Sequence, residues 1–191
     1  MTKKNQWIAK HVQDKYVKLA QKDNFRSRAS YKLLEINSKY HIIQKQATNV
    51  IIDLGAAPGG FSQVVARHSH LNTKIIAVDL LEMKSIAKVS FIQGDFRDAN
   101  ILKEIDSLLQ QQSSKKAQLI MSDMSPNLSG DKFRDQCNII ELCELILDFA
   151  LQYLQNNGYF LVKIFQGHGF VEYRQQLIQN FTKVICCKPE A

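Results

Sequence analysis

Apolar and polar positions form two kinds of segment along this 191-residue chain. Short apolar runs without polar alternation are typical of strands buried on both faces of a parallel sheet. Longer segments with apolar residues three or four positions apart are typical of amphipathic helices. From residue 49 onward the two kinds alternate, which predicts an α/β fold with a parallel sheet flanked by helices. The predicted strands are 50–54, 74–79, 89–92, 119–123, 159–165 and 183–187.

The helical segments separate these strands and also precede the first of them. Residues 7–20 form an amphipathic pattern with lysines between the apolar positions, and a second helix begins near Ser27 or Ala29. The longest helical pattern spans 136–155 and ends at an Asn-Asn-Gly sequence that is typical of a helix C-terminus. The remaining predicted helices are 60–67, 101–109 and 173–181.

A glycine-rich turn joins the first strand to its helix, in the stretch NVIIDLGAAPGGFSQ at 49–63. Glycines such as Gly55 and Gly59 at the carboxyl end of a buried strand let the backbone pass close to a ligand. A dinucleotide fingerprint would need glycine at Ala57, so pyrophosphate binding is disfavoured. Asp79 ends the next strand 24 positions after Gly55, where an acidic partner for ribose hydroxyls is expected. The pattern predicts an adenosine-containing cofactor, and S-adenosylmethionine, which lacks pyrophosphate, fits it.

Further polar residues follow other strands. In an open α/β sheet the ligand lies over the carboxyl ends of the strands, so these side chains are expected to face one edge. Lys163 lies in an otherwise apolar strand, where burial would lower its pKa and make it a candidate general base. The expected edge residues are Asp53, Asp79, Asp95, Asp123 and Lys163.

The net charge of +7 is concentrated at the N-terminal end. Residues 1–45 contain eleven Lys and Arg against three Asp and Glu, so they hold the whole positive excess. Such a localised excess predicts a polyphosphate partner such as RNA. The candidate RNA-binding residues are Lys10, Lys15, Arg26, Arg28 and Lys32.

Several classes of protein and site are disfavoured by the same sequence. No run of eighteen apolar residues or signal-like N-terminus occurs, which predicts a cytoplasmic protein without a membrane span. The four cysteines lack zinc-site spacing, so no metal site is expected. We expect a monomer with a single domain, in which a basic helical extension at 1–45 precedes a cofactor-binding core at 46–191.

Seven stretches of the chain, in order and over nearly its whole length, resemble the FtsJ/RrmJ (RlmE) family of ribosomal RNA large-subunit ribose 2′-O-methyltransferases. The stretches are SRASYKL at 27–33, DLGAAPGGFSQ at 53–63, AVDLLEM at 77–83, FIQGDFRD at 91–98, MSDMSPNLSG at 121–130, LVKIFQGHGF at 161–170 and FTKVICCKPEA at 181–191. The resemblance implies a Rossmann-like class I fold that uses S-adenosylmethionine to methylate a ribose, with a uridine of 23S RNA in the large subunit as the expected target.

The resemblance also implies roles for individual residues. Lys32, Asp123 and Lys163 match three members of a Lys-Asp-Lys-Glu catalytic set, and Phe61 stands where relatives often carry tryptophan. The cofactor contacts implied by the matching motifs, together with the first glycine of the loop, are Gly55, Gly59, Phe61, Asp79, Asp95 and Asp123. The fourth catalytic residue and the final antiparallel strand of the family have no counterpart after Cys187, so the sequence is expected to be truncated at its C-terminus.

Three other functions compete with this interpretation. A nicotinamide-dependent oxidoreductase is disfavoured by Ala57 and by the absence of a Tyr-x-x-x-Lys pair. A noncatalytic or weakly catalytic ribosome-assembly factor is disfavoured because Asp79 and Lys163 are both present. A methyltransferase acting on the 2′-hydroxyl of a tRNA anticodon loop is the alternative within the same enzyme class.

Overall fold

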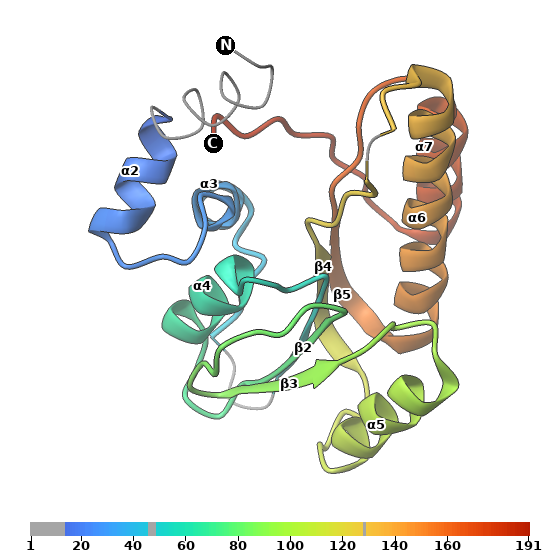
Figure 1. Ribbon diagram of the computed structural model, residues 1–191. Coiled ribbons are helices and arrows are strands. Elements are labelled where there is room, and N and C mark those ends of the chain that lie inside the picture. Colours follow the sequence, from blue (N-terminus) through green and yellow to red (C-terminus); the bar gives the residue numbers. More distant parts are fainter. Residues whose placement is uncertain (1–13, 46–48, 128) are drawn as a thin grey trace.

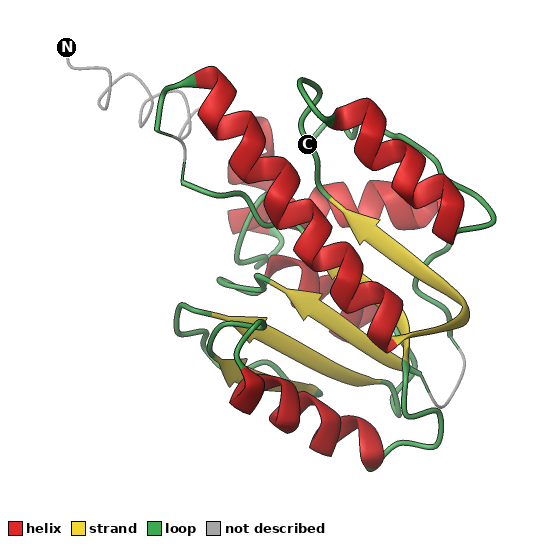
Figure 2. Ribbon diagram, turned by 90° about the vertical axis from the view of Figure 1, so that its right-hand side faces the viewer, coloured by secondary structure: helices red, strands yellow, loops and turns green. Residues whose placement is uncertain are grey.

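Five parallel strands form the centre of the protein, with helices on both faces (Figures 1 and 2). The computed structural model describes residues 14–45, 49–127 and 129–191. Its strands are β1 (Val50–Leu54), β2 (Lys74–Asp79), β3 (Val89–Gln93), β4 (Ala117–Ser122) and β5 (Leu154–Val162). Its helices are α2 (Lys15–Lys22), α3 (Ala29–Tyr40), α4 (Gly60–His68), α5 (Ala99–Gln110), α6 (Lys132–Tyr153) and α7 (Phe170–Asn180).

The order of the strands locates the edge of the sheet where a ligand is expected. The sheet runs β3-β2-β1-β4-β5, so the chain moves outward from β1 in one direction and then returns to start again on its other side with β4. Every residue of β1 and β4 is buried, as expected for the two central strands of a parallel sheet. A crevice opens at the carboxyl ends of strands where the order reverses. Here that point lies between Leu54 and Ser122, which are paired in the sheet.

Each face of the sheet has its own apolar core. On one face Leu33 of α3 and Val64 of α4 pack in a cluster with Ile51 of β1. On the other face the clustered residues Ile105 of α5 and Ile146 of α6 pack with further residues of the sheet. Figure 1 shows α2, α3 and α4 on one side of the sheet and α6 and α7 on the other. The second predicted helix of the chain is therefore part of the folded core.

The predicted elements are confirmed from 29 to 122, with bounds that differ by a few residues. The predicted helix at 7–20 is described from Lys15, where Asp14 caps α2 by accepting the N–H of Tyr16, and its first residues lie outside the described part. The predicted turn after the long helix lies inside β5. Between the pairs Ala117–Leu154 and Leu119–Tyr159 the register shifts, so residues 155–158 bulge out of the ladder.

The predicted strand at 183–187 is wrong. Phe181 stacks on Phe160 of β5 with ring centroids 5.6 Å apart, and the chain then crosses to α3 without joining the sheet (Figure 1). There the backbone N–H of Glu190 donates to the Glu35 carboxylate over 2.9 Å. A strand needs a neighbour to pair its N–H and C=O groups, and the described residues include no strand beside 183–187.

The longest helix of the fold is not a membrane span. Among the described residues, no helix is both long enough and apolar enough to cross a bilayer.

Replacing Leu33 by alanine should destabilise the protein by about 2–5 kcal/mol, because this fully buried side chain joins α3 to the sheet core. Urea unfolding measures the change. Leu71→Ala is the matched control, since Leu71 is 79% exposed and its truncation should change stability by less than about 0.5 kcal/mol. Equal effects of the two substitutions would show that α3 does not share the core.

Candidate active site

The glycine loop after β1 has the backbone conformation that its sequence predicts. Gly55 has φ +70° and Gly59 has φ +107°, values that side chains with a Cβ rarely adopt. A Cβ at Gly55 would collide with the Met124 side chain, and one at Gly59 would lie 2.8 Å from Ile86 and 2.9 Å from Met83. Both glycines therefore allow close approach of the loop to groups from neighbouring segments, as a cofactor cradle requires.

Asp79 lies at the end of β2 and accepts two backbone hydrogen bonds. Its carboxylate accepts hydrogen bonds from the N–H of Ala57 in the glycine loop and from the N–H of Leu81, each 2.8 Å long. Each carboxylate oxygen keeps a further lone pair for a ligand hydroxyl. Asp79 thus stands against the glycine loop, where a ribose could bridge the two.

An apolar cluster lies next to Asp79. Ala56, Ala77 and Met83 are buried together, with Ile86 and Phe91 packed against them. Apolar side chains suit the flat, weakly polar face of an adenine ring, so the chemistry of this region fits an adenosine-containing cofactor. Asp95 lies after β3 and is held by Arg97, whose guanidinium donates to both carboxylate oxygens. That ion pair holds the pKa of Asp95 below its ordinary value.

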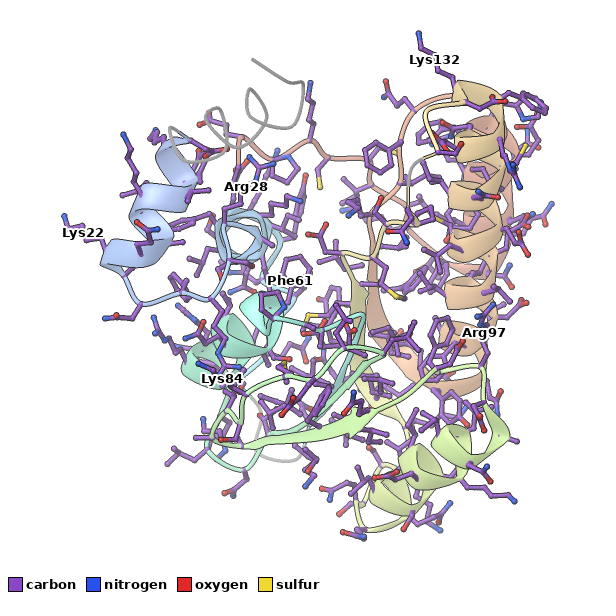
Figure 3. The ribbon with its side chains drawn as sticks, in the orientation of Figure 1. Lys22, Arg28, Phe61, Lys84, Arg97 and Lys132 are labelled. Atoms are coloured by element: carbon purple, nitrogen blue, oxygen red, sulfur yellow. The ribbon has the colours of Figure 1, made fainter. Side chains whose placement is uncertain are left out.

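Phe61 lies in the first turn of α4 and is 6% exposed (Figure 3). It belongs to the cluster that contains Leu33 and Val64, so most of its surface already contacts protein. Its predicted contact with a cofactor stays a prediction.

Arg26 contacts the cofactor loops, although the sequence predicts an RNA contact. Its guanidinium donates to the carbonyl oxygens of Pro58 (3.2 Å), Lys84 (2.6 Å) and Ser85 (2.8 Å). The first carbonyl lies in the glycine loop and the other two in the segment after β2. Arg26 therefore ties together the two loops on either side of Asp79, and its role toward RNA stays a prediction.

The three predicted catalytic residues meet at the carboxyl ends of β4 and β5. Lys32 Nζ of α3 lies 3.1 Å from both oxygens of the Asp123 carboxylate. Lys163 Nζ lies 3.3 Å from one of those oxygens and also donates to the Asp123 carbonyl. One carboxylate thus holds two ammonium groups, one from helix α3 and one from the end of β5.

Burial lowers the pKa of Lys163 below its ordinary value, and the nearby charge of Lys32 acts in the same direction. The Asp123 carboxylate opposes this effect, but the net shift is downward. Lys163 follows β5 directly, where its backbone N–H donates to the Ser122 carbonyl over 3.0 Å. The strand end therefore holds an amine that gives up its proton more readily than an ordinary lysine.

The remaining RNA-binding candidates differ in what they contact. Lys15 is exposed on α2, and its Nζ lies 5.3 Å above the ring of Tyr16. Arg28 forms an ion pair with Asp14 and keeps 44% of its side chain exposed. Lys10 lies outside the described residues. The structure thus places Lys15 and Arg28 on the surface, near the helix that carries Lys32.

Asp53 is not at the ligand edge, which corrects the expectation from the sequence. It is buried in β1 with 1% exposure and accepts the hydroxyl of Ser62 over 2.6 Å. Burial raises the pKa of Asp53 to about 7. The sequence contained a signal for this buried pair. Asp53 is the one acid in an otherwise apolar strand, and Ser62 lies in the first turn of the helix that follows. Asp53 thus joins β1 to α4, the helix that follows the glycine loop.

Among the described residues, no group of three or more His, Cys, Asp or Glu side chains could hold a metal ion.

Comparisons with known proteins agree with this geometry. The model of the family FtsJ-like methyltransferase matches residues 25–191. The chain belongs to the FtsJ-like methyltransferase family. The matched range contains every predicted catalytic and cofactor residue, whereas Lys10 and Lys15 precede it.

Curated relatives of this FtsJ-like methyltransferase carry the name ribosomal RNA large subunit methyltransferase E. The protein from Neisseria gonorrhoeae is 48% identical over 97% of this chain and 87% of its own length. The one from Chromobacterium violaceum is 45% identical over 98% of this chain and 89% of its own. A crystal structure from Plasmodium falciparum, described as a ribosomal RNA methyltransferase, is 31% identical, covers 87% of this chain and 92% of its own, and superposes with a TM-score of 0.78.

Replacing Asp53 by asparagine should flatten the dependence of stability on pH. Because the folded-state pKa of Asp53 is raised, the native state holds a proton that the unfolded state has already lost between about pH 4 and pH 7. Wild-type stability should therefore fall as pH rises through this window, by up to about 4 kcal/mol. Asparagine cannot titrate and still accepts the Ser62 hydroxyl, so urea unfolding of both proteins from pH 4 to pH 8 isolates this contribution. Parallel pH profiles would contradict it.

Proposed function

We propose that this protein transfers a methyl group from S-adenosylmethionine to the 2′-hydroxyl of a ribose in large-subunit ribosomal RNA, with a uridine of the 23S RNA as the expected target. The observation that carries the proposal is the carboxylate of Asp123 between Lys32 and Lys163, at the strand edge that also holds the glycine loop. Membership of the FtsJ-like methyltransferase family and the names of the relatives support the substrate.

The cofactor would lie across the glycine loop. Gly55 and Gly59 would let the backbone approach its methionine part, and Asp79 would accept hydrogen bonds from its ribose hydroxyls. Asp95 and Asp123 would flank the adenine and sulfonium ends respectively, and Phe61 would lie beneath them. When bound, the cofactor supplies an activated methyl group on a sulfonium.

The protein then has two tasks at the reacting hydroxyl. It must hold the 2′-oxygen in line with the methyl group, and it must take the proton as charge develops on that oxygen. Lys163 would accept the proton, because burial favours its neutral amine. Asp123 would orient Lys163, and Lys32 would stabilise the negative charge that develops on the oxygen.

The alternatives fit these observations less well. The family match excludes the nicotinamide oxidoreductase, and the relatives named for the ribosomal large subunit favour ribosomal RNA over tRNA. A factor without catalysis would have no need to assemble Lys32, Asp123 and Lys163 within hydrogen-bonding distance. A cytoplasmic location, a monomeric state and the domain boundary at residue 46 stay predictions.

The proposed activity is tested with S-adenosylmethionine that carries a labelled methyl group. Large ribosomal subunits, naked ribosomal RNA and tRNA lacking the modification are incubated separately with the protein. Label should enter large-subunit RNA and survive in alkali-resistant dinucleotides, because a methylated 2′-oxygen cannot assist cleavage of the RNA backbone. Label confined to tRNA would reject the ribosomal assignment, and absence of label from all three substrates would reject the activity.

Lys163→Ala should abolish this methyl transfer and leave the affinity for S-adenosylmethionine nearly unchanged, because Lys163 is assigned to the proton and not to the cofactor. In the wild type the rate should rise with pH through the lowered pKa of Lys163. Lys39→Ala on α3 is the matched control, since Lys39 is exposed and its Nζ lies over the ring of Tyr40. Turnover by the Lys163 variant at the wild-type rate would end the assignment.

Asp79→Ala should weaken binding of S-adenosylmethionine by about 1–3 kcal/mol, because ribose hydroxyls lose a charged acceptor and the N–H of Ala57 loses its partner. Calorimetry measures the affinity directly. Asp148→Ala, an exposed acid on α6, removes the same charge away from the site and should leave the affinity unchanged. Wild-type affinity in the Asp79 variant would show that Asp79 has only a structural role.

A further inference from the structure

Three aromatic side chains are exposed on α6 and in the loop that follows Lys163, and we call them the aromatic surface: Phe133, Phe165 and His168. Phe133 is 64% exposed and Phe165 is 43% exposed, although both are large apolar residues. The rings of Phe133 and His168 meet edge to face, with centroids 5.1 Å apart and an interplanar angle of 66°. Apolar rings held open to solvent in a defined arrangement indicate a binding surface.

The aromatic surface is joined to the catalytic residues. Phe165 follows Lys163 by two positions, and Lys163 Nζ lies 5.8 Å above its ring. Gln136 in the first turns of α6 donates to the Phe165 carbonyl over 3.2 Å. A Cβ at Gly167 would collide with the same Gln136 side chain, so the loop that carries His168 packs closely on α6. A ligand on these rings would therefore continue directly from the lysine pair.

Both cations and acids surround the aromatic surface. Lys132 and Arg134 are exposed and flank Phe133 in the sequence. The neighbouring acids keep their negative charge, but their oxygens already accept hydrogen bonds: Asp131 from the N–H groups of Phe133 and Arg134, and Asp135 from Ser129 and Gly130. Glu172 is a further exposed acid on α7.

The same surface lies opposite the basic N-terminal helices. Figure 3 shows Lys132 at the end of α6 on one side of the molecule and Arg28 on α3 on the other, with the sheet edge between them. Cations thus lie on both sides of the site. The exposed aromatic ring beside Lys163 is that of Phe165, which lies on the side of α6. A strand of RNA that enters between the two sides would meet phosphate contacts on each and ring contacts on one.

We propose that bases of single-stranded RNA next to the methylated nucleotide stack on Phe133 and Phe165, while Lys132 and Arg134 contact the adjoining phosphates. The proposal rests on the RNA methyltransferase function and adds a second wall to its substrate site. Aromatic rings stack on any base and do not require a particular sequence, and cations beside them neutralise the backbone. The rings of His168 and Phe133 meet at an angle of 66°, so they are not stacked face to face.

The test separates RNA binding from turnover. Affinity for a single-stranded RNA of the target sequence is measured by fluorescence anisotropy, and KM and kcat are measured with the large-subunit substrate. Phe133→Ala should weaken RNA affinity and raise KM by about fivefold to a hundredfold, the range expected for loss of one stacked base. Phe165→Ala should do the same and can also lower kcat, because Phe165 contacts Lys163. Phe133→Trp should retain wild-type values.

Three further measurements decide the interpretation. Leu71→Ala is the matched control, since Leu71 is the most exposed large apolar residue of the described chain and precedes β2 at the opposite edge of the sheet. S-adenosylmethionine affinity should be unchanged in both phenylalanine variants, and unchanged melting temperatures show that they fold. Wild-type RNA affinity and KM in both alanine variants would overturn the proposal. Failure of the wild type to methylate any RNA would overturn the enzymatic function instead, and the anisotropy series would still test the stacking surface.

Discussion

The site depends on one carboxylate that holds two lysines in a partly buried position. Asp123 lies 3.1 Å from Lys32 and 3.3 Å from Lys163, and all three side chains are less than 30% exposed. One negative charge cannot neutralise two positive charges, and burial lowers the pKa of Lys163, which favours loss of its proton. Because Lys32 lies on α3 whereas Asp123 and Lys163 follow β4 and β5, this arrangement requires α3 to be packed on the sheet.

The cofactor edge depends in the same way on contacts between loops. Asp79 binds the backbone of the glycine loop, and Arg26 binds carbonyls of that loop and of the segment after β2. Beneath them Asp53 binds Ser62 inside the core. The glycine loop and the segment after β2 are therefore held together by hydrogen bonds to Asp79 and Arg26.

Much of the fold was predictable because buried parallel strands have a strong local pattern. The apolar runs of β1, β2 and β4 and the spacing of α4 and α5 were located within a few residues. The strand at 183–187 was wrongly predicted because apolar alternation gives a segment its tendency to be extended, whereas strand formation needs a partner. Phe181 instead stacks on Phe160, and Glu190 binds α3.

The sequence by itself determined the family, the glycine loop and the identities of the three residues that meet at the site, because their chemistry and order along the chain carry that information. Only the tertiary structure decided what each side chain contacts. Arg26 lies in a basic segment and was assigned to RNA, yet its guanidinium reaches carbonyls 32 to 59 positions away. Asp53 follows the same apolar run that ends at the glycine loop, yet it points into the core and not to the ligand edge. Charge and periodicity are local properties of a chain, whereas hydrogen-bond partners and burial are set by packing between distant segments.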